Sequence, residues 1–128
     1  MLIRFRQWWH AKKKAREEAR WPERKIIISL GPEVISATYP NGTVESASIQ
    51  SLNTVEVHTD DSGPWGADVW FIFASASGDC RFPQGATGEK EALDFMFALP
   101  GFDNEQFIKA MGSTSNAVFP CWQKLNAL

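Results

Sequence analysis

The residues best suited to nucleophilic chemistry in this sequence are His58 and Cys80. A cysteine beside an imidazole forms an activated thiolate, so a cleft that joined both residues with an acidic group would indicate a hydrolase. Their spacing does not require such a pairing. His58 alternates with Val55, Val57 and Thr59, which places it on the more hydrated face of a predicted strand. Cys80 is expected to be a buried structural cysteine. We therefore predict no catalytic site, and a small hydrolase or other enzyme using His58 and Cys80 is the alternative.

The loop "TDDSGPWGAD" gathers three carboxylates, Asp60, Asp61 and Asp68. Hard cations such as Ca²⁺ and Mg²⁺ prefer clustered oxygen ligands. The spacing does not match an EF-hand, however, and Asp, Ser, Gly and Pro are also the usual residues of a strand connection. We therefore predict no metal site. Trp65 lies near the tip of this loop and is a candidate partner contact, because loops carried by a rigid sheet often bind.

Cofactor signatures are also missing from the sequence. Cys80 and Cys121 have no cysteine or histidine neighbour at zinc-ligand spacing, and we expect two reduced thiols. The segment "GATGE" lacks the Lys-Ser/Thr that follows a phosphate-binding loop and instead resembles the beginning of a helix. We predict that the protein uses no cofactor.

The charges are divided between the beginning of the chain and its remainder. Residues 1–25 contain nine basic and three acidic side chains, a net charge of +6, whereas residues 26–128 contain four basic and twelve acidic side chains, a net charge of −8. Such an asymmetry is typical of an interaction arm attached to a folded unit. We predict an arm over residues 1–22 and a single domain over residues 23–128.

The arm is predicted to be a basic amphipathic helix. Apolar residues recur in it at three- and four-residue steps, at Leu2, Phe5 and Trp8 or Trp9, and residues 11–20 are strong helix formers. Pro22 ends the helix, because the residue before a proline is biased away from the helical conformation.

Four interpretations of this helix stay open. It can pack on its own domain through its tryptophans, contact an acidic protein partner or a second copy of the chain, lie on an anionic membrane surface, or bind nucleic acid. A protein partner or self-association is the first expectation. The candidate contact residues, besides Trp65, are Phe5, Trp8, Trp9, Lys12, Lys13, Lys14 and Arg16. Nucleic acid binding by the domain is not expected, because its aromatic strands have almost no basic neighbours.

From Lys25 the apolar pattern changes from helical to alternating, which predicts six short strands. The segments are "KIIISL", "EVISATY", "TVESASI", "NTVEVHT", "DVWFIFAS" and "CRF". Asn41-Gly42 is a hairpin signal between the second and third, because both residues tolerate positive φ. Trp70, Phe71 and Phe73 are expected to pack in the core. The pattern predicts an antiparallel meander.

After the strands the helical spacing returns. Residues 89–99 are predicted to form a helix with Thr87 or Gly88 at its cap. Asp103, three residues before Gln106, predicts the cap of a second short helix, which Gly112 closes and whose apolar side would be Phe107, Ile108 and Met111. The tail "AVFPCWQKL" is expected to add a last strand or an irregular cover.

Two resemblances follow from these segments. "LPGFDN" at residues 99–104, together with Cys121-Trp122, resembles a family of small, uncharacterised bacterial proteins over residues 24–123, and this likeness implies no activity. The order of six antiparallel strands and a C-terminal helix resembles the pleckstrin-homology superfold, a bent half-barrel plugged by a helix. That superfold implies an architecture but not a function.

The sequence therefore predicts an α+β protein with an antiparallel, curved sheet of six or seven strands, C-terminal helices and an N-terminal basic helix. No apolar run reaches the length of about 18 residues that a membrane-spanning helix needs, and no export signal is recognised. We expect a non-enzymatic binding or scaffold module that is located in the cytoplasm. If the arm lies on an anionic membrane, the module would be attached to the periphery of the inner membrane. A purely structural homo-oligomer subunit is a further alternative.

Overall fold

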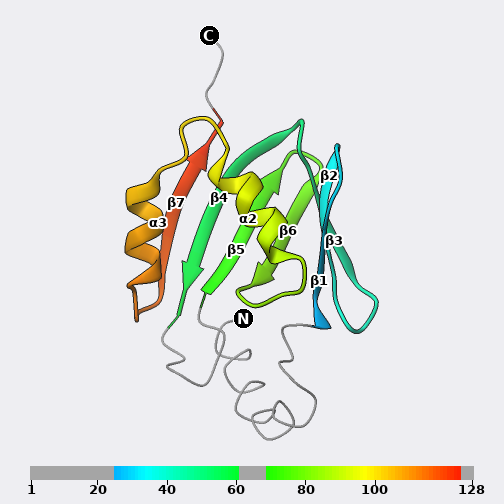
Figure 1. The fold of residues 1–128 in the computed structure, drawn as a ribbon, viewed down its shortest axis with the longest axis horizontal. Helices are drawn as coiled ribbons and strands as arrows, with labels where there is room; N and C mark the ends of the chain where they lie inside the picture. Colours follow the sequence, from blue (N-terminus) through cyan, green and yellow to red (C-terminus); the bar gives the residue numbers. More distant parts are fainter. Residues whose placement is uncertain (1–24, 61–68, 125–128) are drawn as a thin grey trace, which may run out of the picture.

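The structure is a computed structural model that describes residues 25–60 and 69–124. Within these ranges the chain forms seven strands and two helices (Figure 1). Their bounds are β1 Ile27–Leu30, β2 Val34–Thr38, β3 Val44–Ser48, β4 Leu52–Thr59, β5 Val69–Ser75, β6 Gly78–Pro83, α2 Glu89–Phe97, α3 Asn104–Met111 and β7 Ala117–Gln123. The six predicted strands are confirmed to within two residues at each end, and the tail supplies the seventh.

The strands form two antiparallel sheets. One has the order β1-β2-β3, and the other has the order β6-β5-β4-β7. The α+β class and the antiparallel pairing are confirmed, whereas the prediction of one continuous sheet is wrong. The strands β1, β2 and β3 pair in chain order, as do β4, β5 and β6, and β7 returns to pair with β4. β3 forms no backbone ladder with any strand of the second sheet.

Side chains join the two sheets where β3 lies beside β6. The backbone N–H of Arg81 donates to Oε1 of Glu45 at 3.0 Å, and the Tyr39 hydroxyl donates to the carbonyl oxygen of Arg81. Gly78 permits the close approach, because a Cβ there would lie 2.9 Å from the carbonyl oxygen of Ser46. The side chains of Glu45 and Tyr39 thus bond the backbone N–H and carbonyl of Arg81, which a neighbouring strand would otherwise pair with. This explains why the sheet is divided at this point.

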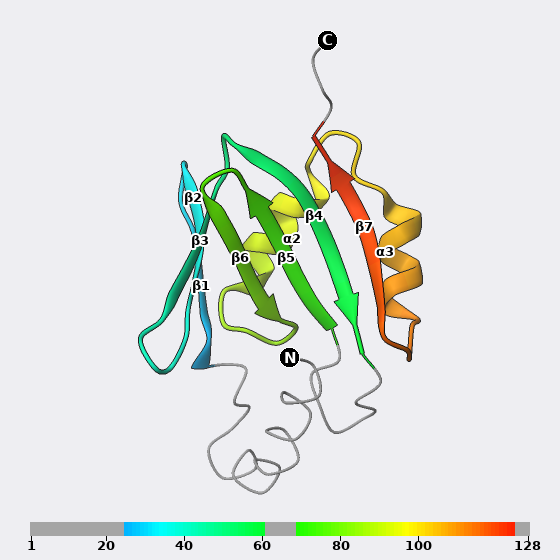
Figure 2. The same cartoon turned by 180° about the vertical axis from the view of Figure 1, so that it is seen from behind.

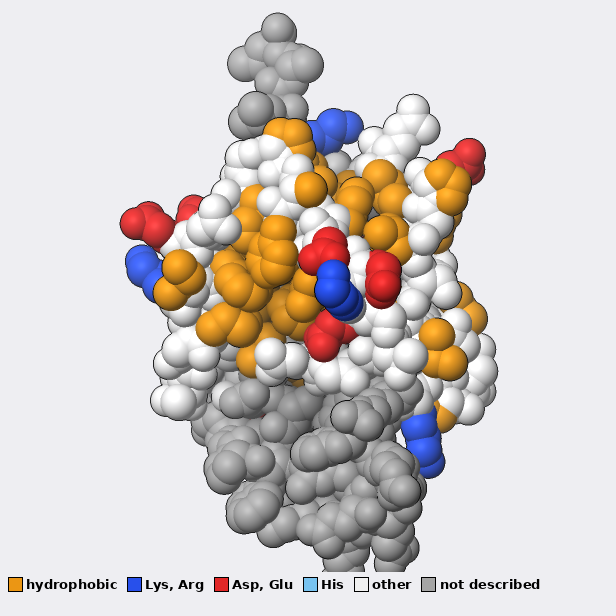
Figure 3. Space-filling view, viewed as in Figure 1, with side chains coloured by type: hydrophobic (Ala, Val, Ile, Leu, Met, Phe, Trp, Pro, Cys, Tyr) orange, Lys and Arg blue, Asp and Glu red, His pale blue; other side chains and the backbone are white. Residues whose placement is uncertain are grey.

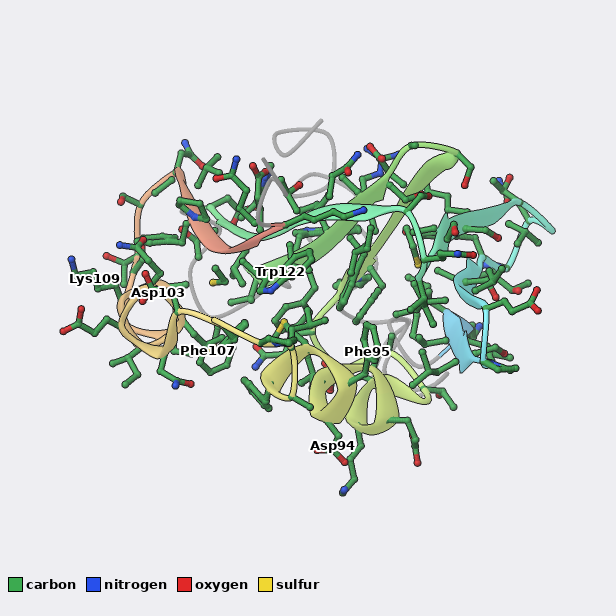
Figure 4. The ribbon with its side chains drawn as sticks, turned by 90° about the horizontal axis from the view of Figure 1, so that it is seen from above. Asp94, Phe95, Asp103, Phe107, Lys109 and Trp122 are labelled. Atoms are coloured by element: carbon green, nitrogen blue, oxygen red, sulfur yellow. The ribbon has the colours of Figure 1, made fainter. Side chains whose placement is uncertain are left out.

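Both helices lie on the same face of the four-stranded sheet (Figures 1 and 4). Seen from behind, the other face of this sheet carries neither α2 nor α3 (Figure 2). The core lies between the helices and the sheets, where Ala92 and Met96 of α2 and Ala110 of α3 are fully buried. The sheet residues that they cover are Val55, Val57, Phe71, Phe73, Cys80 and Phe82, each at most 1% exposed.

The beginning of α2 is bound to β1. The backbone N–H of Ile28 donates to the carbonyl oxygen of Thr87 at 2.7 Å, and the N–H of Thr87 donates to the carbonyl oxygen of Ile26 at 2.9 Å. Thr87 or Gly88 was predicted as the cap of this helix, and the cap is Gly88, which has a left-handed φ of 87°. A Cβ at this position would lie 2.3 Å from the carbonyl oxygen of Ile28, so only glycine allows β1 to pack here.

The cap of α3 is confirmed, but its apolar side is partly wrong. Oδ1 of Asp103 accepts from the backbone N–H of Gln106 at 3.1 Å, and Gly112 follows the last turn. Ala110 is the buried residue of the helix, whereas Ile108 is 67% exposed and Met111 is 37% exposed. The helix is amphipathic as expected, but the short side chain of Ala110 allows it to lie close to β7, and this orientation turns Ile108 outward.

The predicted arm, residues 1–22, lies outside the described residues, as do the 61–68 loop and residues 125–128. Of the helices in the described part of the chain, neither has the length and apolar character needed to cross a bilayer.

Candidate binding site on the open sheet face

The face of the four-stranded sheet away from α2 and α3 is called the open face below. Its side chains come from alternate positions of three strands, because successive residues of a strand point to opposite sides. While Val55 and Val57 enter the core, Glu56 and His58 point the other way. The open-face residues are Thr54, Glu56 and His58 of β4, Trp70, Ile72 and Ala74 of β5, and Asp79 and Arg81 of β6.

These residues line a hollow of about 390 Å³. That volume falls in the range of roughly 300–1,000 Å³ that is usual for ligand sites. Trp70 and Ile72 supply apolar surface in its middle, on the central strand β5. Charged side chains flank them on both neighbouring strands. The hollow therefore combines an apolar floor with polar groups at its sides, which is the usual composition of a binding site.

Trp70 was expected to pack in the core with Phe71 and Phe73, and its burial is confirmed, since it is only 7% exposed. Phe71 and Phe73 belong to the buried cluster under the helices. Trp70 directly precedes Phe71 in β5 and so faces the opposite side of the sheet. The three residues are therefore all buried, but they do not share one face.

An imidazole–carboxylate pair forms one side of the hollow. Nε2 of His58 lies 2.9 Å from Oε1 of Glu56, and both side chains are about one-third exposed. The two residues are neighbours on one face because they are separated by a single inward residue, Val57. His58 was predicted on the more hydrated face of its strand, and this prediction is confirmed. The imidazole and the carboxylate are hydrogen-bonding groups that a bound molecule can contact at this side of the hollow.

A second ion pair forms the other side of the hollow, at the junction of the two sheets. Nη2 of Arg81 lies 2.7 Å from Oε2 of Glu45, and Nε lies 3.3 Å from Oε1. The hydrogen bond to Glu45 raises the pKa of Arg81. Burial first, and then Glu45, raises the pKa of Tyr39 above its ordinary value, so this phenol stays protonated and donates to Arg81.

Two further hollows meet the first one at Arg81. One of about 610 Å³ follows the junction of β3 and β6 past Glu45 and Asp79. Another of about 200 Å³ extends along the β2–β3 hairpin past Tyr39 and shares Trp70 with the open face. Arg81 lines all three hollows, so a ligand longer than a small molecule can follow the surface from β4 to the hairpin.

The hydrolase alternative required His58 and Cys80 to converge, and the structure does not bring them together. Cys80 pairs with Phe73 on the core side of the sheet and is fully buried, whereas His58 pairs with Trp70 on the open face. Burial, with a smaller contribution from Glu45, raises the pKa of the Cys80 thiol to about 12, so it is not a nucleophilic thiolate near neutral pH. The predicted burial of Cys80 is confirmed, and Cys80 and Cys121 are both free thiols as expected.

Among the described residues, no group of three or more His, Cys, Asp and Glu side chains is arranged to hold a metal ion. Asp60 is fully buried at the end of β4, and the other two carboxylates of the considered cluster, Asp61 and Asp68, lie outside the described residues. The predicted contact residues lie there as well: Phe5, Trp8, Trp9, Lys12, Lys13, Lys14, Arg16 and Trp65.

The open face itself was not predicted as a site. The alternation of Glu56 and His58 with two valines indicated a polar face of β4. No local pattern indicated the pairing of Arg81 with Glu45, because the two residues are 36 positions apart in the chain. Comparison with known protein families, with curated proteins and with solved structures gives no match to this chain. The resemblances to a small bacterial family and to the pleckstrin-homology superfold therefore stay predictions.

Proposed function

We propose that this chain is a non-enzymatic binding or scaffold module that holds a segment of a partner protein on its open face. The observation that carries this proposal is the hollow of about 390 Å³ on the side of the sheet away from α2 and α3. Its apolar floor of Trp70 and Ile72 favours an apolar side chain, and its polar sides favour a defined orientation of the bound group.

The charges of the site favour a cationic partner segment. Among the described residues, three carboxylates line the connected hollows, those of Glu45, Glu56 and Asp79, and the guanidinium of Arg81 is bonded to Glu45. A segment that carries Lys or Arg next to an aromatic residue would bind both features of the hollow. Electrostatic complementarity of this kind acts mainly on specificity and on the association rate.

A titration of the full chain tests this function. The probe is the acetylated and amidated peptide Arg-Trp-Arg-Trp, with Glu-Trp-Glu-Trp as the matched acidic probe, and the measurement is isothermal titration calorimetry. We expect Glu56→Gln to weaken the binding of the basic probe about tenfold, since a charge-assisted hydrogen bond contributes roughly 1.5–3 kcal/mol. Glu33→Gln is the control, because it removes an equal charge from an exposed position before β2 that lines none of these hollows. Equal affinities in all three proteins, or a preference for the acidic probe, would contradict the proposal.

Association of the arm with an anionic membrane surface is the second candidate function. The net charge of +6 over residues 1–25, next to Phe5, Trp8 and Trp9, supports it. Each basic residue near such a surface contributes about 1 kcal/mol. The location in the cytoplasm, with peripheral attachment to the inner membrane, belongs to this same proposal.

Vesicle co-sedimentation tests the membrane candidate. Vesicles of phosphatidylcholine alone are compared with vesicles that also contain phosphatidylserine. We expect the triple variant Lys12→Gln, Lys13→Gln, Lys14→Gln to lose binding to the anionic vesicles. The matched triple variant Lys90→Gln, Lys109→Gln, Lys124→Gln removes the same charge from the body and should bind like the unmodified chain. Equal sedimentation of both variants would remove this candidate.

The finer description of the fold is part of the proposal. The two antiparallel sheets, with α2 against one face, support a pleckstrin-homology-like half-barrel. The insertion of α3 and the return of the chain as β7 depart from the simplest version of that layout.

A further inference from the structure

The helix-covered side of the molecule has an aromatic patch between α2 and α3. It consists of Phe97 of α2, Phe102 of the connection and Phe107 of α3. The ring of Phe97 meets Phe102 and Phe107 edge to face, with centroids 5.5 and 5.0 Å apart. Phe97 is 43% exposed, and Figure 3 shows hydrophobic side chains gathered between the two helices. Phe107 points from α3 into this space (Figure 4).

The two helices that carry the aromatic patch are acidic, and their charged side chains are called the acidic border below. Glu89, Glu91 and Asp94 belong to α2, and Asp103 and Glu105 lie at the beginning of α3. The two helices contribute only two lysines, of which Lys90 is bonded to Asp94 at 2.7 Å. The border therefore carries a net charge of −3, and a segment that combines aromatic with basic residues would complement it.

We propose that the aromatic patch is the docking site of the chain's own arm, residues 1–22. Phe5, Trp8 and Trp9 supply the aromatic side chains, and Lys12, Lys13 and Lys14 supply the charge that the acidic border attracts. No stretch of residues 26–128 has this composition, since those residues hold four basic side chains in all. The inference goes beyond the proposed function, because it uses the side of the sheet opposite to the open face.

The connection of the chain brings the arm to this side. Ile26 is bonded to Thr87, directly before α2, so the chain before Lys25 leaves the described part beside the acidic beginning of that helix. The nine residues of α2 span about 13 Å, whereas the 22 residues of the arm would span about 33 Å even if fully helical. The arm therefore reaches from the start of α2 to Phe97.

Covalent attachment makes a weak contact sufficient. A tethered segment has an effective concentration on the order of millimolar. A contact with a dissociation constant of about 0.1 mM would then keep the arm bound for roughly nine-tenths of the time. Docking covers Phe97 in the free protein, and it competes with any outside partner or membrane that binds the same aromatic residues.

Chymotrypsin cleavage of the full chain after Phe5, Trp8 and Trp9, followed by mass spectrometry, tests the docking. When opening is fast, the cleavage rate follows the population of the undocked arm. We expect Phe97→Lys to raise the rate about tenfold, because the new cation repels the arm and the apolar contact is lost. Val44→Lys is the matched control, since Val44 is 56% exposed on the other sheet, and its rate should equal that of the unmodified chain.

A second variant leaves the patch unchanged. The triple variant Lys12→Glu, Lys13→Glu, Lys14→Glu keeps the cleavage sites and the folded body, and repulsion from the acidic border should raise cleavage to a similar extent. Glu56→Gln on the open face should leave cleavage unchanged, which separates this test from that of the proposed function. Equal rates in all variants would overturn the inference. Protection that increases with protein concentration would also overturn it, since the arm would then dock on a second copy.

Discussion

The two faces of the four-stranded sheet differ although the same strands form both. On the covered face, Phe71, Phe73 and Phe82 pack together with ring centroids 5.5 and 5.9 Å apart and are almost inaccessible to water. On the open face, one residue further along β5, Ile72 is flanked by Glu56 and Arg81 on the neighbouring strands. The covered face is apolar except for the buried Thr59, whose hydroxyl donates to the carbonyl oxygen of Ser115, and the open face mixes apolar with charged residues.

This difference indicates which face folds the protein and which face is available for recognition. Apolar burial is the main source of folding free energy, and it is concentrated on the covered face. Charged side chains on the open face contribute less to folding, but in a hollow they orient the bound group and make its binding selective. Substitutions on the two faces should therefore have separable effects on stability and on binding.

The largest difference in stability should appear between substitutions of two neighbouring residues of β5 that point to opposite faces. Phe73→Ala creates a cavity in the core and should lower the free energy of unfolding by about 3–5 kcal/mol. Ile72→Ala should lower it by about 1 kcal/mol, because Ile72 is only half-buried on the open face. Urea denaturation monitored by circular dichroism measures both values. Equal losses would mean that the two faces contribute alike to folding.

An intermediate effect is expected at the junction of the sheets. Glu45→Ala removes the acceptor for the backbone N–H and the guanidinium of Arg81, and should cost about 2 kcal/mol of stability. Asp94→Ala is the control, because it breaks the exposed Lys90–Asp94 pair. Its free energy of unfolding should equal that of the unmodified chain within the error of the urea measurement. If both variants unfold like the unmodified chain, Glu45 does not join the sheets.

A smaller effect should appear as a pH dependence of stability on the covered face. An unfolded thiol releases its proton near its ordinary pKa of 9.0, whereas burial raises the pKa of Cys80 to about 12. Between these values the folded state binds more protons than the unfolded state, so the free energy of unfolding falls as pH rises. Cys121, with a pKa raised by burial to about 11, adds to the same trend.

Cys80→Ala isolates this contribution. Replacing the thiol should reduce the loss of stability between pH 8 and pH 10 by about 1 kcal/mol, whatever its effect on stability at pH 8. Urea denaturation at both pH values gives the difference. An identical loss in the variant and the unmodified chain would show that Cys80 ionises equally in both states.

Local patterns in the sequence predicted the strands and helices better than their arrangement. The alternation of Val55 and Val57 with Glu56 and His58 located β4 and its polar face, and Asp103 before Gln106 located the beginning of α3. The division into two sheets depends on Glu45 and Tyr39 reaching Arg81, contacts over 36 and 42 residues that no local pattern indicates.

The candidate site was less predictable for the same reason. Trp70 was assigned to the core together with Phe71 and Phe73 as one aromatic strand, but Trp70 and Phe71 are adjacent in β5 and point to opposite faces. Ile108 was assigned to the apolar side of α3 by its spacing, but a helix of eight residues offers more than one such side, and the close approach of Ala110 to β7 selects another one.

The most direct test of the central claim, that the open face is the recognition surface, is amide chemical-shift mapping by NMR. The full ¹⁵N-labelled chain is titrated with the peptide Arg-Trp-Arg-Trp. We expect saturable shifts that are largest at Glu56, Trp70 and Arg81 and that become smaller in the Glu56→Gln variant. Shifts confined to α2 and α3, or no saturable shifts at all, would contradict it.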